Sequence, residues 1–439
     1  MTQDVGAARD SPIDPYLPQN GNRGYSVDRY ELSLEYKVHS NRLSGKAVVH
    51  AVTTRQISEF SLDMGPALSP SKVGIAGMRG VRFTHRGAKL TVKAQRPIAE
   101  GTPFVLTVAY SGNPAPIKGV WGEVGWEELT DGAIVASQPN GAASWFPCDD
   151  HPSSKAAYTI SVTTDSPYHV VSNGTLTHTY VKSSRTTWVY EQPEPMATYL
   201  ATVQIGLYER HRVCSTPVPV DAVLPARLRR NFDHDFGRQQ QMMETFVESF
   251  GPYPFDSYAV VVTDDELEIP IEAQTLSIFG ANHCAGDRGY ERLVAHELAH
   301  QWFGNSLTIG RWSDIWLHEG FACYSEWIWS ENSNGPSAHQ EATRAHSRLS
   351  SLPQDLVLAD PTPDDMFDDR VYKRGALALH ALRRTLGDGP FFDLLREWTT
   401  TFRHSTVATA DFVALAKKYG SDDDFWESWL RKKRLPRLP

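Results

Sequence analysis

The sequence predicts an α+β protein in which an N-terminal antiparallel β domain precedes a mainly helical domain. Short alternating apolar and polar segments recur through the first two hundred residues, and helical periodicity prevails beyond residue 287. With 439 residues, the chain is long enough for two such domains and a sizeable core. We expect the β domain over residues 1–212 and the second domain over residues 213–439.

The β prediction rests on strands whose apolar residues occupy every second position. The first such strand alternates charged or polar residues with Tyr30, Leu32, Leu34 and Tyr36. Similar alternation recurs over 104–110, 160–162 and 201–205. Clusters of glycine, proline and serine separate these segments, as turns between strands require.

The second domain is predicted to be helical apart from a short strand over 258–262. A first amphipathic helix over 227–250 ends at the Gly251-Pro252 pair, which cannot continue a helix. The remaining helices are expected over 287–304, 316–332, 337–350, 371–386, 389–402, 408–418 and 424–434.

Composition excludes several classes of protein. The net charge is −9, from 43 lysines and arginines against 52 aspartates and glutamates, which argues against nucleic-acid and anionic-membrane partners. Four isolated cysteines indicate neither a disulfide scaffold nor a zinc knuckle. The polar N-terminus resembles no signal peptide, and no apolar run is long enough to span a membrane, so a cytoplasmic monomer is the default expectation.

Residues 296–300 form an H-E-x-x-H motif, the most informative feature of the chain. On a helix, His296 and His300 share one face about 6 Å apart along the axis, so both imidazoles can bind one zinc ion. Glu297 would stand beside the ion as a general base, and Glu319 is placed to be the third ligand on the next helix. A chance match on a surface helix is the alternative, but the apolar residues around the motif predict a buried helix.

The expected ligand set defines a chemistry. Two imidazoles and a carboxylate leave a fourth zinc position for water, and zinc lowers the pKa of that water to about 7. Glu297 can take the water proton and deliver it to the leaving amine. The developing oxyanion needs a further donor, usually a tyrosine or histidine, which composition does not select among 17 tyrosines.

Several motifs together resemble the aminopeptidase N and leukotriene hydrolase family of gluzincin zinc peptidases. The resemblance lies in the H-E-x-x-H motif, the stretch 316–322 around Glu319, the loop 146–152 and the start of the catalytic domain at 251–255. These motifs follow one another in the family's order, and the resemblance covers nearly the whole chain. The resemblance implies a saddle-like β sandwich followed by a thermolysin-like catalytic domain with one zinc ion.

The resemblance also implies a role for each site residue. His296, His300 and Glu319 would bind zinc, Glu297 would be the general base, and Tyr372 would stabilise the oxyanion. The substrate's free α-amine would be bound by two further residues, Glu272 and Gln138.

The chain departs from the family pattern in two places. In the stretch 269–274 the family's glycine, methionine and asparagine around Glu272 are replaced, and Pro270 lacks an N–H group, which alters the surroundings of the α-amine. The chain ends at Pro439 without the long helical domain of many relatives, which predicts a more open site. Cys323, one turn after Glu319, is expected to be a packing residue, and His318 replaces the family's asparagine.

Three functions follow for the chain. The leading one is a zinc aminopeptidase that removes N-terminal residues from peptides. The first alternative is a zinc endopeptidase or leader-peptide-processing protease of the same fold, which the open site and the altered 269–274 stretch favour. The weakest is an inactive peptide-binding protein, because the zinc ligands, the base and Tyr372 are all present.

Overall fold

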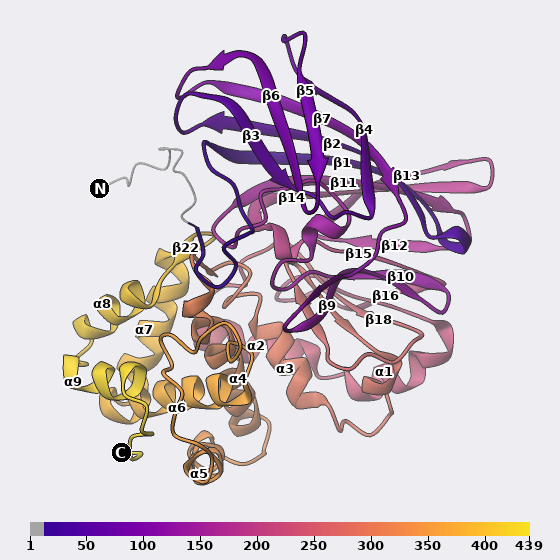
Figure 1. The fold of residues 1–439 in the computed structure, drawn as a ribbon. Coiled ribbons are helices and arrows are strands. Elements are labelled where there is room, and N and C mark those ends of the chain that lie inside the picture. The colour runs from indigo at the N-terminus through magenta and orange to yellow at the C-terminus, as the bar shows by residue number, and fades with distance from the viewer. Residues whose placement is uncertain (1–12) are drawn as a thin grey trace. The chain divides into compact units, whose positions relative to one another are not determined.

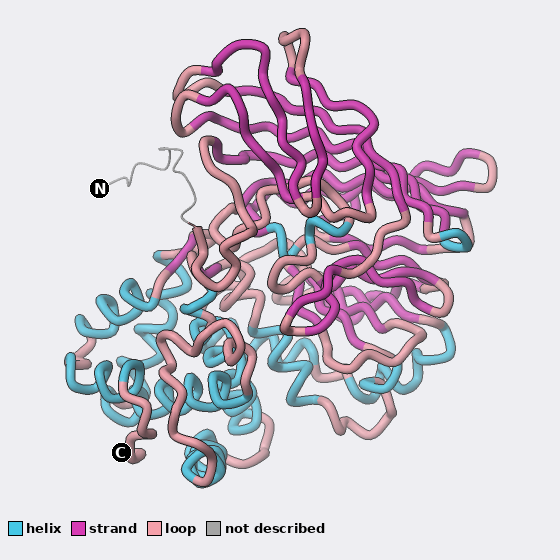
Figure 2. The backbone as a smooth tube through the Cα atoms, in the orientation of Figure 1, coloured by secondary structure: helices cyan, strands magenta, loops and turns pink. Residues whose placement is uncertain are grey.

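The computed structural model describes residues 13–439, which form two compact units, one ending at Glu209 and the other running from Arg210 to Pro439 (Figure 1). The predicted order is confirmed, because strands dominate the first unit and helices the second (Figure 2). The N-terminal stretch that we compared with a signal peptide begins outside the described residues. Between residues 13 and 439 no helix is both long and apolar enough to cross a membrane.

The N-terminal unit contains three β-sheets. In spatial order, the seven-stranded sheet consists of β13 (Thr175–Lys182), β14 (Arg185–Ala197), β11 (Lys155–Asp165), β1 (Tyr25–Lys37), β2 (Arg42–Thr53), β7 (Pro103–Gly112) and β4 (Leu68–Ile75). The five-stranded sheet consists of β12 (His169–Ser172), β15 (Val203–Gly206), β10 (Gly132–Ala136), β9 (Gly122–Leu129) and β8 (Ile117–Gly119). The three-stranded sheet consists of β3 (Ile57–Asp63), β6 (Lys89–Ile98) and β5 (Arg82–Arg86).

The alternation read from the sequence sets the inward face of β1. Tyr30, Leu32, Leu34 and Tyr36 are all buried, while the residues between them are more exposed. β1 runs antiparallel to β2, as predicted, but parallel to β11, a strand that lies more than a hundred residues later in the chain. The unit is therefore mainly, not wholly, antiparallel.

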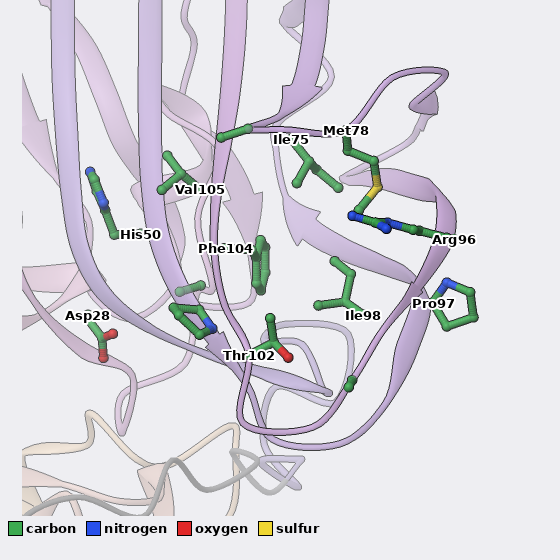
Figure 3. A pocket seen from close by; sticks show the side chains of 14 residues that line it. Asp28, His50, Ile75, Met78, Arg96, Pro97, Ile98, Thr102, Phe104 and Val105 are labelled. Carbon is green, nitrogen blue, oxygen red and sulfur yellow. The ribbon is translucent and has the colours of Figure 1, made fainter.

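A cavity of about 570 Å³ lies in the N-terminal unit (Figure 3). Ile75, Ile98 and Phe104 form its apolar part, and His50 and Asp28 stand at one side. None of its lining residues is a predicted site residue.

The C-terminal unit is built on a five-stranded sheet with the spatial order β16 (Glu209–Cys214), β17 (Val220–Leu224), β18 (Tyr258–Val262), β20 (Leu276–Phe279) and β19 (Ile271–Ala273). β17, β18 and β20 are parallel, whereas β19 is an antiparallel edge strand. β21 (Thr308–Ile309) and β22 (Thr406–Val407) form a separate short ladder. Only the strand over 258–262 was predicted here.

Nine α-helices of the described residues belong to this unit. They are α1 (Arg229–Asp235), α2 (Gln239–Phe250), α3 (Glu291–Ala299), α4 (Trp316–Asn332), α5 (Ala338–Ser350), α6 (Asp369–Leu386), α7 (Asp388–Thr401), α8 (Thr409–Lys418) and α9 (Asp423–Trp426), the last continuing as a π-helical turn over Glu427–Arg431.

The helices predicted over 227–250 and 287–304 differ most from the observed ones. The helix expected over 227–250 is broken between Asp235 and Gln239. At this break the Asp235 carboxylate accepts hydrogen bonds from the backbone N–H groups of Gly286 (2.7 Å) and Arg288 (2.8 Å). Those bonds hold the segment before α3 as a loop, so α3 starts at Glu291 rather than at residue 287.

Two glycines allow α4 and α6 to approach closely. A Cβ atom on Gly320 would lie 2.8 Å from the Cα of Gly375, and one on Gly375 would lie 2.7 Å from the Cα of Gly320. Any larger residue would force the helices apart. Gly320 follows Glu319 directly, and Gly375 lies three residues after Tyr372, so this contact sets the distance between two predicted site residues.

Candidate active site

The three predicted zinc ligands come together where α3 meets α4. One ligand atom each from His296, His300 and Glu319 lies within 4.8 Å of the others, and all three residues are buried. Glu319 Oε2 is 3.4 Å from His296 Nε2 and 3.5 Å from His300 Nε2. His300 caps α3 at its C-terminus, and its backbone N–H still donates to the carbonyl of His296, which keeps both rings on one face.

The outer nitrogen of each imidazole has its own acceptor. His296 Nδ1 lies 2.8 Å from Glu326 Oε1, and His300 Nδ1 lies 3.0 Å from the carbonyl oxygen of Phe303. Both acceptors favour the tautomer with hydrogen on Nδ1, which leaves both Nε2 atoms free to bind a metal. Sequence reasoning missed Glu326, although it lies two helical turns after Glu319 and so on the same face.

Gly304 makes the turn after His300 possible. Its φ of +131° is a conformation that side chains rarely adopt, and a Cβ there would lie only 3.2 Å from His300 Nδ1. The absence of a side chain at Gly304 therefore leaves room for the hydrogen bond between His300 Nδ1 and the Phe303 carbonyl oxygen.

The surroundings favour positive charge at the ligand cluster. Burial alone would lower the pKa of His296, but hydrogen bonds to Glu319 and Glu326 raise it to about 9. Burial likewise opposes the charged form of His300, yet Glu272 and Glu319 raise its pKa to about 10. Against the effect of burial, His300 and His296 hold the pKa of Glu319 well below its usual range. A bound dication would supply the positive charge that these carboxylates attract.

Glu297 is buried beside the cluster with one free oxygen. Its side chain is 4% exposed, and its Oε2 atom has no hydrogen-bond partner among residues 13–439. Burial raises the pKa of Glu297 to about 7, which is the range of an effective general base. A carboxylate oxygen of Glu297 lies within 4.8 Å of a ring nitrogen of His300, so this carboxylate stands next to the ligand cluster.

Glu272 joins the site from the edge strand β19. Its carboxylate, that of Glu297 and a ring nitrogen of His300 lie within 4.8 Å of one another. Burial raises the pKa of Glu272, while His300 opposes the shift.

Two amides in the segment that follows α3 hold Glu272's strand. Gln301 accepts from the backbone N–H of Thr275 at 2.8 Å and donates to the carbonyl of Ala273 at 3.0 Å. Asn305 donates to the same carbonyl at 3.0 Å. Neither residue was singled out from the sequence, although Gln301 directly follows His300.

Tyr372 reaches the site from α6. Its ring lies 6.0 Å from that of His296, nearly parallel to it. Burial, together with Glu319 and Glu272, raises its pKa well above the usual value, so the phenol keeps its proton and can donate a hydrogen bond.

The other residues noted in the sequence have different roles. Gln138 follows β10 in the N-terminal unit, and its part in substrate binding stays a prediction. His318 is buried, and its Nε2 accepts a hydrogen bond from the backbone N–H of Ile309 at 2.9 Å. Cys323 is buried, as expected of a packing residue, and its Sγ accepts from Lys373 Nζ at 3.1 Å.

The donor set fits a zinc ion. Two imidazole nitrogens and one carboxylate oxygen are the protein ligands of many catalytic zinc sites, in which the fourth position takes water or substrate. The orphaned Glu297 oxygen and the concentration of buried carboxylates around the two histidines suit the binding of a cation.

Replacing Glu326 by glutamine should weaken zinc binding. The amide keeps the shape but removes the charge that orients His296, so we expect a 10- to 100-fold higher Kd for zinc, on the order found for such outer partners. Competition with a chromophoric chelator measures this Kd. Glu331→Gln, on the same helix and ion-paired with Arg383, is the control. Equal zinc affinities in the two variants would contradict the orienting role of Glu326.

The fold and the ligand cluster together match the zinc metallopeptidase class, and comparison with known proteins gives the family. The peptidase M1 N-terminal domain matches residues 26–200, and the peptidase family M1 domain matches residues 234–429. The chain belongs to peptidase family M1, whose members hydrolyse peptide bonds, and the structural similarity extends to an M1 zinc metallopeptidase.

Individual relatives agree with this assignment. A leucyl aminopeptidase of Saccharolobus solfataricus is 26% identical over 94% of this chain and 54% of its own length. The chain spans about half the length of the first aminopeptidases that it matches. The M1 zinc metallopeptidase of Deinococcus radiodurans is 29% identical, with a TM-score of 0.88 over 97% of this chain and 98% of that one. Yeast LTA4 hydrolase shares the fold, with 21% identity and a TM-score of 0.80 over 98% of this chain and 70% of that one.

Proposed function

We propose that this protein is a zinc-dependent aminopeptidase whose catalytic domain covers residues 213–439. His296, His300 and Glu319 bind zinc, and Glu297 is the general base. Tyr372 stabilises the oxyanion, and Glu272 with Gln138 binds the free α-amine of the peptide. The observation that carries the proposal is the position of Glu272, whose carboxylate lies within 4.8 Å of the base and of a zinc ligand.

That position favours cleavage next to an N-terminus. A peptide ammonium paired with Glu272 has its first carbonyl only a few ångströms away, close to the ligand cluster. An amine bound there is held by a half-buried carboxylate, where a charge pair is stronger than in water. An acetylated N-terminus carries no positive charge, so it cannot form this charge pair with Glu272.

The residues divide the chemistry between them. A bound zinc ion supplies Lewis acidity toward the scissile carbonyl and toward the attacking water. Glu297 takes a proton from that water and returns it to the leaving amine. Tyr372 donates its phenolic hydrogen to the carbonyl oxygen as negative charge develops there.

The structural relatives support a peptide ligand with a free N-terminus. A variant of the Deinococcus radiodurans enzyme has been crystallised with the substrate Tyr-Ser-Ala, and a variant of a two-domain M1 zinc metallopeptidase has been crystallised with L-tryptophan and with L-arginine. Each of these molecules carries a free α-amine.

One ten-residue peptide, free and N-acetylated, tests the proposal. We expect mass spectrometry to show successive single-residue losses from the free peptide and none from the acetylated one. Glu272→Gln should lower kcat/KM for the free peptide on the order of 10²-fold, because a partly buried charge pair is lost. The control is Glu268→Gln, an exposed glutamate four residues earlier.

The endopeptidase remains the second candidate because the stretch before Glu272 is unusual. Ile269 is 68% exposed, and Pro270 offers no N–H group to a substrate. The endopeptidase would replace the aminopeptidase if internal fragments arose from both peptide forms and Glu272→Gln lowered kcat/KM equally for the free and the acetylated peptide.

A further inference from the structure

A two-residue turn with an unfavourable backbone conformation lies next to Glu272. β19 and β20 pair antiparallel with Ala273 opposite Leu276, so Gln274 and Thr275 form the whole turn. Of these two residues only Thr275 has a positive φ, of +72°. Turns of this length place glycine or asparagine at positive φ, because a larger side chain crowds the backbone there. A β-branched threonine suits this conformation poorly, so the surrounding structure must hold the turn.

The side-chain amide of Gln301 holds both sides of this turn. Its oxygen accepts a hydrogen bond from the backbone N–H of Thr275 at 2.8 Å, and its nitrogen donates to the carbonyl of Ala273 at 3.0 Å. Gln301 is completely buried, where a hydrogen bond is electrostatically stronger than in water. One rigid planar group therefore fixes the residue before the turn relative to the residue with the strained φ.

Gln301 also belongs to the segment that carries the predicted zinc ligands. It directly follows His300, and its backbone N–H donates to the carbonyl of Leu298 at 3.1 Å. The same residue is thus anchored to the end of α3 by its backbone and to the turn by its side chain. It links the position of the turn to the position of the ligand cluster.

The position of Glu272 depends on this turn. Glu272 directly precedes Ala273 in β19, a strand of three residues at the edge of the sheet. An edge strand pairs on one side only, so the turn is a large part of what holds so short a strand. A change in the φ of Thr275 would shift β19 and move the Glu272 carboxylate, which now lies within 4.8 Å of Glu297 and His300 ligand atoms.

We propose that Gln301 is a positioning residue for the α-amine of the substrate, because it holds the strained turn that places Glu272 beside the ligand cluster. This role rests on the proposed aminopeptidase function, since it takes Glu272 as the partner of the amine. Gln301 acts through Glu272, so its loss weakens the binding of the peptide N-terminus more than it slows the chemical step.

Gln301→Met removes both hydrogen bonds and keeps the length of the side chain. We expect the KM of a free peptide to rise about tenfold, as for the loss of buried hydrogen bonds, and kcat to change much less. The amine is held alike in the ground state and the transition state, so weaker holding appears in KM. A merely structural fault, with less folded or zinc-loaded enzyme, would lower kcat and leave KM unchanged. The control is Gln239→Met, which removes another buried glutamine of the same unit and should keep the wild-type KM.

A second substitution, Thr275→Gly, tests whether the strained turn is the link. Glycine adopts a φ of +72° without a crowding Cβ, so the turn depends much less on the Gln301 amide. We therefore expect Thr275→Gly, added to Gln301→Met, to return KM most of the way to the wild-type value. A KM as high in the double variant as in Gln301→Met would overturn the proposed link.

Hydrogen exchange separates this inference from the proposed function, because it needs no turnover. Deuterium uptake over residues 271–277, read by mass spectrometry, should rise in zinc-loaded Gln301→Met and stay at the wild-type level in Gln239→Met. If the wild-type enzyme releases no N-terminal residue but uptake rises, the aminopeptidase proposal fails while the hold of Gln301 on the turn stands. If the wild-type enzyme is an aminopeptidase but Gln301→Met changes neither KM nor uptake, the positioning role fails and the aminopeptidase proposal stands.

Discussion

Glu297→Gln is expected to lower kcat on the order of 10⁴-fold, the upper end of the range for general acid–base catalysis. Glutamine has nearly the same shape, so it fills the same buried space, but its amide cannot accept the proton of the attacking water. Glu297 Oε2 has no hydrogen-bond partner among residues 13–439, so the substitution breaks no hydrogen bond of that atom in the described fold. We therefore expect unchanged zinc content and thermal stability.

Three measurements on one preparation check this prediction: turnover of a free peptide, zinc per chain and the melting temperature. The matched control is Glu291→Gln, which removes a glutamate from the first turn of the same helix, where it pairs with Arg238. Turnover of Glu297→Gln within a few-fold of wild type would exclude the proposed mechanism. A loss of zinc would instead place Glu297 among the metal ligands.

Tyr372→Phe should have the second largest effect, a loss of about 10²- to 10³-fold in kcat, as for other oxyanion donors. The substitution removes one hydroxyl and keeps the ring beside His296. The pKa of Tyr372 lies well above its usual value, so the wild-type phenol carries its proton throughout the neutral range. Because the donor acts on charge that develops during the reaction, KM should change much less than kcat.

Steady-state kinetics on one free peptide separate the two parameters. Tyr419→Phe serves as the control, since it also removes a phenolic hydroxyl, one that donates to Glu397. A negligible loss in Tyr372→Phe would mean that another donor meets the oxyanion. A rise in KM with an unchanged kcat would make Tyr372 a substrate-binding residue instead.

Periodic patterns in the sequence gave correct predictions for features that depend on a single helix or strand. The alternation in β1 gave the correct inward face, and the helix over 316–332 has the predicted bounds. The helix predicted over 287–304 was too long at both ends. At its start, the hydrogen bonds that Asp235 accepts from Gly286 and Arg288 join residues about fifty positions apart. Strands of three to five residues, such as β19 and β20, are too short for a period to be recognised.

The sequence by itself determined which candidate ligands stand together, because H-E-x-x-H on one helix fixes which side chains share a face, and it predicted Glu297 as the base. The resemblance to a known family added Tyr372 and Glu272. Only the tertiary structure decided what holds these residues in place. Glu326 orients the His296 ring, and Gln301 and Asn305 donate hydrogen bonds to the strand that carries Glu272. The contact between Gly320 and Gly375 sets the approach of the two helices that carry Glu319 and Tyr372. These interactions join separate helices and strands, and no local period encodes a distance between elements that only packing brings together.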